Sequence, residues 1–146
     1  MPERSLGQPF VLAAHSMGNL ILKNAIDMLK RYGHWPVPQI CRIVMIAADV
    51  PEKGHVLAYA DVAAETELHI VQNQRDYALV ASSLMRGLRT KTRLGQLARS
   101  RIKDAYYHDF SGQVGCSHSY FLDEHAEESE IRDFFEFTFG CATIAE

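Results

Sequence analysis

Ser16 is the residue of this chain whose type and setting most directly indicate chemistry. It lies in the pentapeptide Ala14-His-Ser-Met-Gly18, between an apolar run, residues 10–14, and a helical pattern that follows at once. A serine on a tight strand-to-helix turn raises its hydroxyl into a cleft, and such a turn needs small residues two positions before and two positions after it. Ala14 and Gly18 meet this requirement. The pattern therefore predicts a nucleophile elbow.

Two residues further along the chain supply what a serine nucleophile needs, a base for its proton and a carboxylate that orients the base. Asp76 follows an apolar run, residues 68–71, and a short polar turn, and His118 lies in a Gly/Ser-rich loop ahead of another helical pattern. Reacting groups in open α/β sheets gather at the carboxyl ends of the strands. We therefore predict a triad in the order Ser16, Asp76, His118.

Other residues compete for these roles. Asp49 also follows a strand and is the alternative acid, while Asp76 has a second interpretation as the N-cap of the helix after it. His108 and His125 are the rivals of His118 for the base. We favour His118 because catalytic residues tend to lie on loops that rigid elements support.

A metal site and a nucleic-acid site are the other functions that the side chains suggest. The residues around the predicted base lack the paired two-residue spacing of zinc ligands, so we expect no metal; they are His108, Asp109, Cys116, His118 and His125. A basic run contains Arg86, Arg89, Lys91, Arg93, Arg99, Arg101 and Lys103. It has no interleaved aromatic residues and the chain has a net charge of −3, so we expect no nucleic-acid binding. The preferred interpretation is a solvated loop that faces the acidic segment 123–136.

The composition is that of a single soluble domain. The chain has 146 residues, of which 47% are apolar and 23% charged. It contains no apolar run long enough to cross a membrane and no signal peptide, which predicts a cytoplasmic protein without an integral membrane segment. The three cysteines are widely spaced, at positions 41, 116 and 141, and indicate a reducing compartment rather than a disulfide framework.

Strand-like and helix-like patterns alternate along the chain. We expect strands at residues 10–14, 40–47, 67–72 and 105–110, and helices at residues 17–31, 55–64, 77–88 and 127–139. Alternation of this kind predicts an α/β fold, an open and mostly parallel sheet with helices on both faces. Helix 55–64 is expected to cover the cleft. Helix 127–139 is amphipathic, with Ile131, Phe134, Phe135 and Thr138 on one face.

Four segments together resemble the α/β-hydrolase superfamily: Ala14-His-Ser-Met-Gly18, Ile46-Ala-Ala-Asp-Val50, Gln74-Arg-Asp-Tyr-Ala-Leu79 and His118-Ser-Tyr-Phe121. Within it, residues 10–139 are similar to a bacterial group of esterase/lipase-like hydrolases whose substrates are largely unassigned. The resemblance implies that Ser16 is the nucleophile, Asp76 the acid and His118 the base. It also implies that the backbone N–H of Met17 forms half of the oxyanion hole, and that no cofactor is required.

The chain departs from the superfamily at its beginning, where the family has several strands before the elbow and this chain has nine residues before its first strand. We therefore expect one domain, residues 1–146, that corresponds to the C-terminal half of the fold. The expected function, once the fold is completed, is hydrolysis of a small or lipid-like carboxylic ester through an acyl-enzyme. The alternatives are a non-catalytic module that forms a homo-oligomer or binds an N-terminal half through an exposed sheet edge, and an acyltransferase or thioesterase with the same triad.

Overall fold

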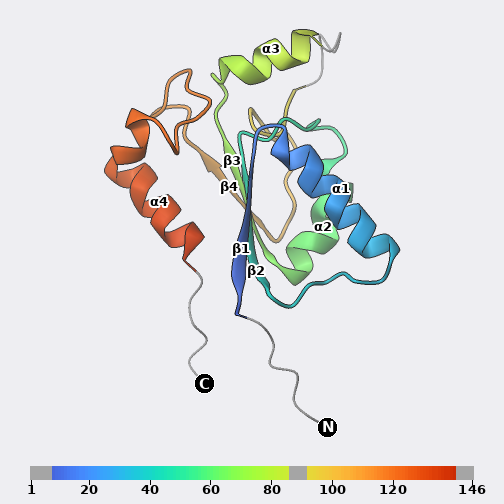
Figure 1. The fold of residues 1–146 in the computed structure, drawn as a ribbon. Helices are drawn as coiled ribbons and strands as arrows, with labels where there is room; N and C mark the ends of the chain where they lie inside the picture. The colour runs from blue at the N-terminus through green and yellow to red at the C-terminus, as the bar shows by residue number, and fades with distance from the viewer. Residues whose placement is uncertain (1–7, 86–91, 141–146) are drawn as a thin grey trace.

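The computed structural model describes residues 8–85 and 92–140, which contain one sheet of four strands. The strands are β1 (Phe10–His15), β2 (Ile40–Ile46), β3 (Glu67–Gln72) and β4 (Ala105–Asp109). They lie in the order in which they occur along the chain, and each pairs in parallel with the next (Figure 1). Their carboxyl ends therefore meet at one edge of the sheet, where the predicted site residues follow them.

Helices cover both faces of this sheet, as the alternating pattern predicts (Figure 1). Helices α1 (Gly18–Arg31) and α2 (His55–Glu65) lie on one face, and α4 (Ser129–Phe139) lies on the other. Helix α3 (Tyr77–Met85) lies beyond the carboxyl ends of the strands, and a short 3-10 helix, η1 (Glu124–Glu127), precedes α4. The predicted fold class, an α/β protein with an open parallel sheet, is confirmed.

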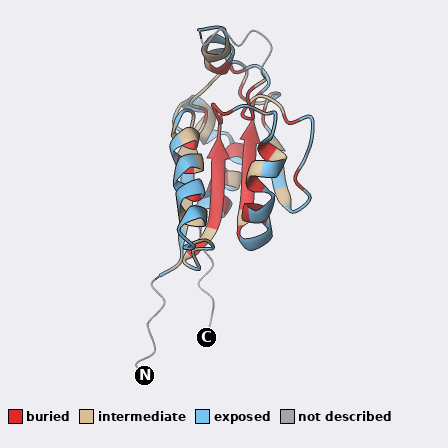
Figure 2. Ribbon diagram, turned by 90° about the vertical axis from the view of Figure 1, so that its right-hand side faces the viewer, coloured by how far each residue is buried: buried red, intermediate tan, exposed pale blue. Residues whose placement is uncertain are grey.

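The core divides into two apolar layers, one on each face of the sheet. The central strands between these layers are buried (Figure 2). Alternate residues of β2 point to opposite layers, so that Ile43 packs with α1 and α2 while Val44 packs toward α4. Strands buried on both faces are continuous apolar runs, which explains the composition of β2. Strand β1 lies at the edge of the sheet and is only partly buried. The central strands thus give the carboxyl edge a rigid support.

Two element predictions need correction. Helix α2 does not cover the cleft, because Tyr59, Val62 and Ala63 bury it against the same sheet face as α1. The predicted helix 127–139 begins two residues later than expected: the 3-10 helix η1 ends at Glu127, and α4 begins at Ser129. Helix α3 ends at Met85 in the described part of the chain, whereas residues 86–91, which the predicted helix 77–88 and basic run include, lie outside it.

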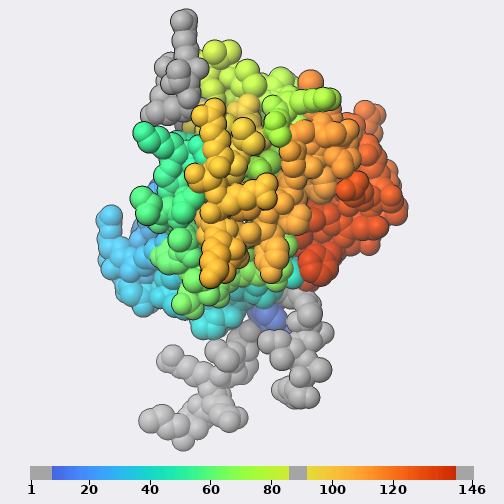
Figure 3. Space-filling model, turned by 180° about the vertical axis from the view of Figure 1, so that it is seen from behind, coloured from blue at the N-terminus to red at the C-terminus, as the bar shows by residue number. Residues whose placement is uncertain are grey.

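The segment after residue 91 is packed on the molecule rather than solvated throughout. Arg93 is 1% exposed, which contradicts the expected solvated loop at that position. The Leu94 N–H donates to Val50 O at 2.9 Å, and the Gly95 N–H donates to Ala48 O at 3.0 Å. A Cβ atom on Gly95 would lie 2.2 Å from Ala48 N, so this close approach requires glycine. In Figure 3 the segment, in yellow, lies between α2 and the loop that follows β4.

The cysteines differ from the sequence-based expectation as well. Cys41, in β2, is disulfide-bonded, and Cys116 is an exposed free thiol. The prediction that the cysteines remain reduced is therefore wrong for Cys41. Among the described residues, none of the helices has the length and apolar character needed to cross a membrane.

Candidate active site at the carboxyl edge of the sheet

The turn that carries Ser16 has the conformation that the elbow pattern predicts. Ser16 follows β1 directly and has a φ of 52°, in the left-handed region that residues other than glycine seldom adopt. Its N–H donates to Ile46 O at 3.0 Å, which ties the turn to the end of β2. Helix α1 begins two residues later, with Met17 as its N-cap. A strained conformation of this kind costs about 1–3 kcal/mol and persists only where the surroundings hold it.

Asn19 is the residue that holds the serine turn. Its side chain is fully buried, and its Nδ2 lies 3.1 Å from Ala14 O, 3.1 Å from Ser16 O and 3.2 Å from Ile46 O. One amide group therefore binds the strand before the turn, the turn itself and the neighbouring strand. The sequence analysis missed Asn19. Its signal was an amide three residues after the serine, within reach of the carbonyls of the turn.

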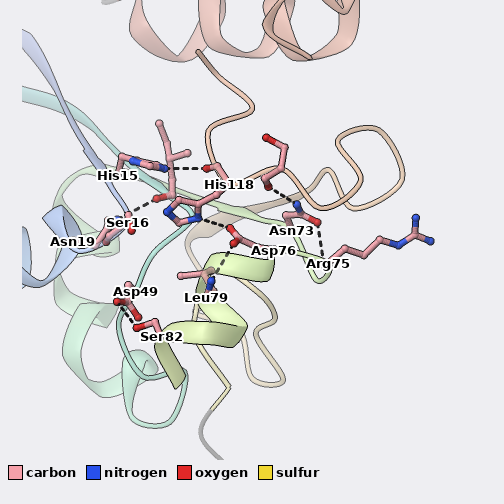
Figure 4. A network of polar contacts seen from close by, with 12 residues as sticks. His15, Ser16, Asn19, Asp49, Asn73, Arg75, Asp76, Leu79, Ser82 and His118 are labelled. Atoms are coloured by element: carbon pink, nitrogen blue, oxygen red, sulfur yellow. Dashed lines mark hydrogen bonds and ion pairs between the residues drawn. The ribbon is translucent and has the colours of Figure 1, made fainter. Parts of the chain in front are cut away.

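Asp76 and His118 are in direct contact (Figure 4). His118 Nδ1 lies 2.7 Å from Asp76 Oδ2, and the carboxylate is fully buried. The other carboxylate oxygen accepts the Leu79 N–H at 3.1 Å, so Asp76 also caps the first turn of α3. The two interpretations of Asp76 are therefore compatible. Because a carboxylate accepts the Nδ1 proton, the Nε2 atom of a neutral His118 is left as a proton acceptor.

The predicted nucleophile lies beside this pair without a hydrogen bond to it. Figure 4 shows the His118 ring between Asp76 and Ser16. Among the described residues, no hydrogen bond joins the Ser16 hydroxyl to His118. Catalytic hydrogen bonds in unliganded enzymes are often long and shorten when substrate binds. The absence of this hydrogen bond in the unliganded chain is therefore compatible with a serine–histidine pair.

Two further side chains hold the loop of His118, and the sequence analysis assigned neither of them a role in the site. Asn73 is fully buried, and its Nδ2 donates to Gly115 O at 3.0 Å and to Ser117 O at 2.8 Å. His15 Nε2 lies 2.9 Å from His118 O. The signal for Asn73 was its place in the same polar turn as Asp76, at the carboxyl end of β3.

The alternative acid, Asp49, is engaged elsewhere. Its Oδ1 lies 3.0 Å from Arg93 Nε in a buried ion pair, and its Oδ2 accepts the hydroxyl of Ser82 at 2.8 Å. Its backbone N–H donates to Ser16 O at 3.2 Å. The Asp49 side chain therefore joins the segment after residue 91 to α3, while the carboxylate in contact with His118 is that of Asp76.

The rival histidines are bound to other side chains. His108 Nε2 lies 2.9 Å from His69 Nδ1 on the sheet face that α4 covers, and burial lowers the pKa of His108 to about 4. His125 is bound to Glu128 at 2.8 Å, an ion pair in which the Glu128 carboxylate raises the pKa of His125. In the part of the chain that the structure describes, no group of three or more such side chains is arranged to bind a metal ion.

An open hollow lies beside His118. It has a volume of about 340 Å³ and is lined by Tyr77, Cys116, Ser117, His118, Ser119, Asp123, Glu124 and His125. Sites for small ligands are commonly of this size or larger. A substrate in the hollow would contact the predicted base directly.

A parallel sheet with a strained serine turn at its carboxyl edge is the arrangement of the α/β hydrolases. A family model described as an alpha/beta hydrolase of unknown function (DUF900) matches residues 4–116, and the chain belongs to this family. The matched range includes Ser16 and Asp76 and ends just before His118. No curated protein and no solved structure matches the chain.

Proposed function

We propose that this chain is a serine hydrolase that cleaves carboxylic esters, like the esterase/lipase-like group that it resembles. The observation that carries the proposal is the 2.7 Å contact between His118 Nδ1 and Asp76 Oδ2 beside the strained turn of Ser16. A buried carboxylate that holds one imidazole nitrogen keeps the other nitrogen available as a base. In this proposal Ser16 is the nucleophile, His118 the base and Asp76 the residue that orients the base.

The reaction would proceed in two halves. The Ser16 Oγ attacks the acyl carbonyl while His118 Nε2 takes its proton, and the resulting imidazolium then gives that proton to the leaving alcohol. Water next attacks the acyl-enzyme, with His118 again accepting a proton and returning it to the Ser16 oxygen as the acid leaves. Asp76 stays ionised throughout and stabilises the imidazolium. No cofactor takes part.

Met17 is the proposed donor to the oxyanion. Its N–H follows the nucleophile and lies at the N-terminus of α1, where the helix dipole favours negative charge. Loss of one oxyanion donor costs roughly 2.7–4 kcal/mol of transition-state stabilisation. In the superfamily the second donor comes from a loop ahead of the elbow. We therefore propose that an N-terminal half, or a second copy of the chain, completes the hole.

A non-catalytic binding module is the second candidate, and the edge of the sheet favours it. Strand β1 pairs with β2 alone among the described strands, and Phe10 at its beginning is 45% exposed. Unpaired strand edges bind further strands. In this alternative the same edge that would receive a complementing half is itself the functional surface. Thioester hydrolysis, or transfer of the acyl group to another acceptor, would use the same three side chains.

Labelling with a fluorophosphonate probe tests the proposal, because such probes modify activated serines. We expect the purified chain to be labelled, and labelling to disappear in Ser16→Ala and in His118→Ala. Ser100→Ala, which removes an exposed serine outside the site, should be labelled like the wild type. A folded wild-type chain that is not labelled would favour the binding module.

A further inference from the structure

His15 is the residue on which the further inference rests. It precedes Ser16 at the end of β1, and its imidazole is turned toward the loop that carries the predicted base (Figure 4). We propose that His15 is a positioning residue, which holds His118 in place by donating its Nε2 proton to the His118 backbone carbonyl. The inference rests on the proposed function for its catalytic meaning, but the contact itself can be tested without activity.

Two observations place the His15 ring against His118. His15 Nε2 lies 2.9 Å from His118 O, and since a carbonyl oxygen only accepts, the Nε2 atom must carry the proton. The two imidazole rings lie 4.7 Å apart between centroids, and the ring of Phe121 lies 4.9 Å from His15 on the same loop. The His15 side chain therefore contacts both the backbone carbonyl and the ring of His118.

The loop needs such contacts because regular structure does not fix it. Strand β4 ends at Asp109 and η1 begins at Glu124, so His118 lies between them without a strand partner or a helical turn. Asn73 binds the carbonyl of Ser117, and His15 binds the next carbonyl along the chain. The backbone on both sides of the His118 Cα is thus anchored by side chains from the turns that carry the other two triad residues.

His15 is suited to this role as a neutral ring. Burial lowers the pKa of His15, and this effect outweighs the hydrogen bond to the His118 carbonyl, which raises that pKa. An uncharged His15 beside the base does not oppose the imidazolium that the proposed mechanism forms on His118. A displacement of the base by about 1 Å can reduce a rate by roughly a hundredfold, so an anchor at this carbonyl would matter for activity.

The test compares two variants of the full chain. His15→Phe keeps an aromatic ring but cannot donate, while His15→Gln keeps an N–H donor without the ring. The first readout is amide hydrogen exchange of residues 111–123, measured by mass spectrometry. Exchange should become about tenfold faster in His15→Phe, the effect of one lost hydrogen bond, and should stay within about twofold of wild type in His15→Gln. Peptides from β3 should exchange as in wild type in both variants.

The second readout is the rate of fluorophosphonate labelling, which should fall in His15→Phe and recover in His15→Gln. Unchanged loop exchange in His15→Phe would overturn the proposal, and so would equal exchange in the two variants, because ring packing would then explain the effect. If the wild type is not labelled, the proposed function fails, while the order of the exchange rates still decides the role of His15.

Discussion

Two of the histidine–carboxylate pairs in the described part of the chain differ in a way that shows what separates a candidate base from a structural histidine. The His118–Asp76 pair at the carboxyl edge and the His69–Glu67 pair on the sheet both have a nitrogen–oxygen distance of 2.7 Å. The second nitrogen distinguishes them. His69 Nδ1 is bound to His108 at 2.9 Å, whereas among the described residues no hydrogen bond occupies His118 Nε2.

The two histidine–carboxylate pairs also differ in their exposure to solvent. His118 lines an open hollow, and its ring lies beside Ser16 (Figure 4). The His69 ring is buried, stacked on Tyr106 at 4.9 Å and on His108 at 5.1 Å. A carboxylate alone therefore does not make a histidine a base. The free nitrogen and access to a reactant decide the role.

The buried pair belongs to a chain of contacts that holds α4. Glu67 also binds Arg42 Nη2 at 3.0 Å, and Arg42 Nη1 donates to the carbonyls of Phe137, Thr138 and Gly140 at 2.8–3.0 Å. These carbonyls end the helix and lack partners within it. The polar residues of this sheet face thus join the C-terminal helix to the central strands.

Replacement of His118 and replacement of His108 should give the largest difference in labelling rate. In His118→Ala we expect fluorophosphonate labelling to fall by roughly 10⁶-fold, the effect of removing the base of a serine triad. His108→Gln, which replaces the histidine bound to His69 on the sheet, should be labelled at the wild-type rate. The measurement is the labelling rate of folded protein at pH 7. Equal loss in both variants would remove the distinction between the two pairs.

The two carboxylates should differ in the same way. Asp76→Asn should reduce labelling by about 10⁴-fold, because the imidazole loses the group that fixes its tautomer. Asp49→Asn should leave labelling of the folded fraction intact and should lower the free energy of unfolding by about 3–5 kcal/mol, since Arg93 loses its buried partner. Labelling rates and urea denaturation of both variants check this. A loss of labelling confined to Asp49→Asn would make Asp49 the acid.

Arg42→Met tests the structural role of the polar contacts that join the sheet to α4. We expect the free energy of unfolding to fall by about 1.5–3 kcal/mol, the contribution of hydrogen bonds to a charged group. Labelling of the molecules that remain folded should not change. Urea denaturation gives the first quantity and a labelling time course the second. Unchanged stability would mean that α4 is held by its apolar face alone.

The smallest expected effect is the pH dependence of stability that arises from the two histidines on the sheet, His69 and His108. Burial lowers the pKa of His108 to about 4 and also lowers that of His69, from an ordinary value near 6.5. Below about pH 6.5 the unfolded chain binds more protons than the folded one, so stability is complete above that pH and is lost as the pH falls toward 4. The urea midpoint should decrease over this interval. His108→Gln should reduce the decrease, and an equal slope in the variant would place its source elsewhere.

Local patterns in the sequence predicted the elements and the serine turn. The apolar run of β2 and the alternation of strands and helices depend on neighbouring residues, and the structure reproduces them within a few positions. Ser16 was recognisable because the turn restricts residues only two positions away, Ala14 and Gly18. The start of α4 shifted by two residues, to Ser129, because a separate 3-10 helix, η1, which Asp123 caps, precedes it.

The sequence by itself determined the strands, the helices and the candidate residues at the strand ends. Only the tertiary structure shows which of those candidates are in contact with one another. Asp49 and Asp76 both follow strands, but Arg93 pairs with the first and His118 contacts the second. The disulfide of Cys41 and the hydrogen bond from Asn73 to the Ser117 carbonyl were likewise not predictable. Asp76 and His118 lie far apart in the chain, and they meet only when the parallel strands bring their carboxyl ends to one edge.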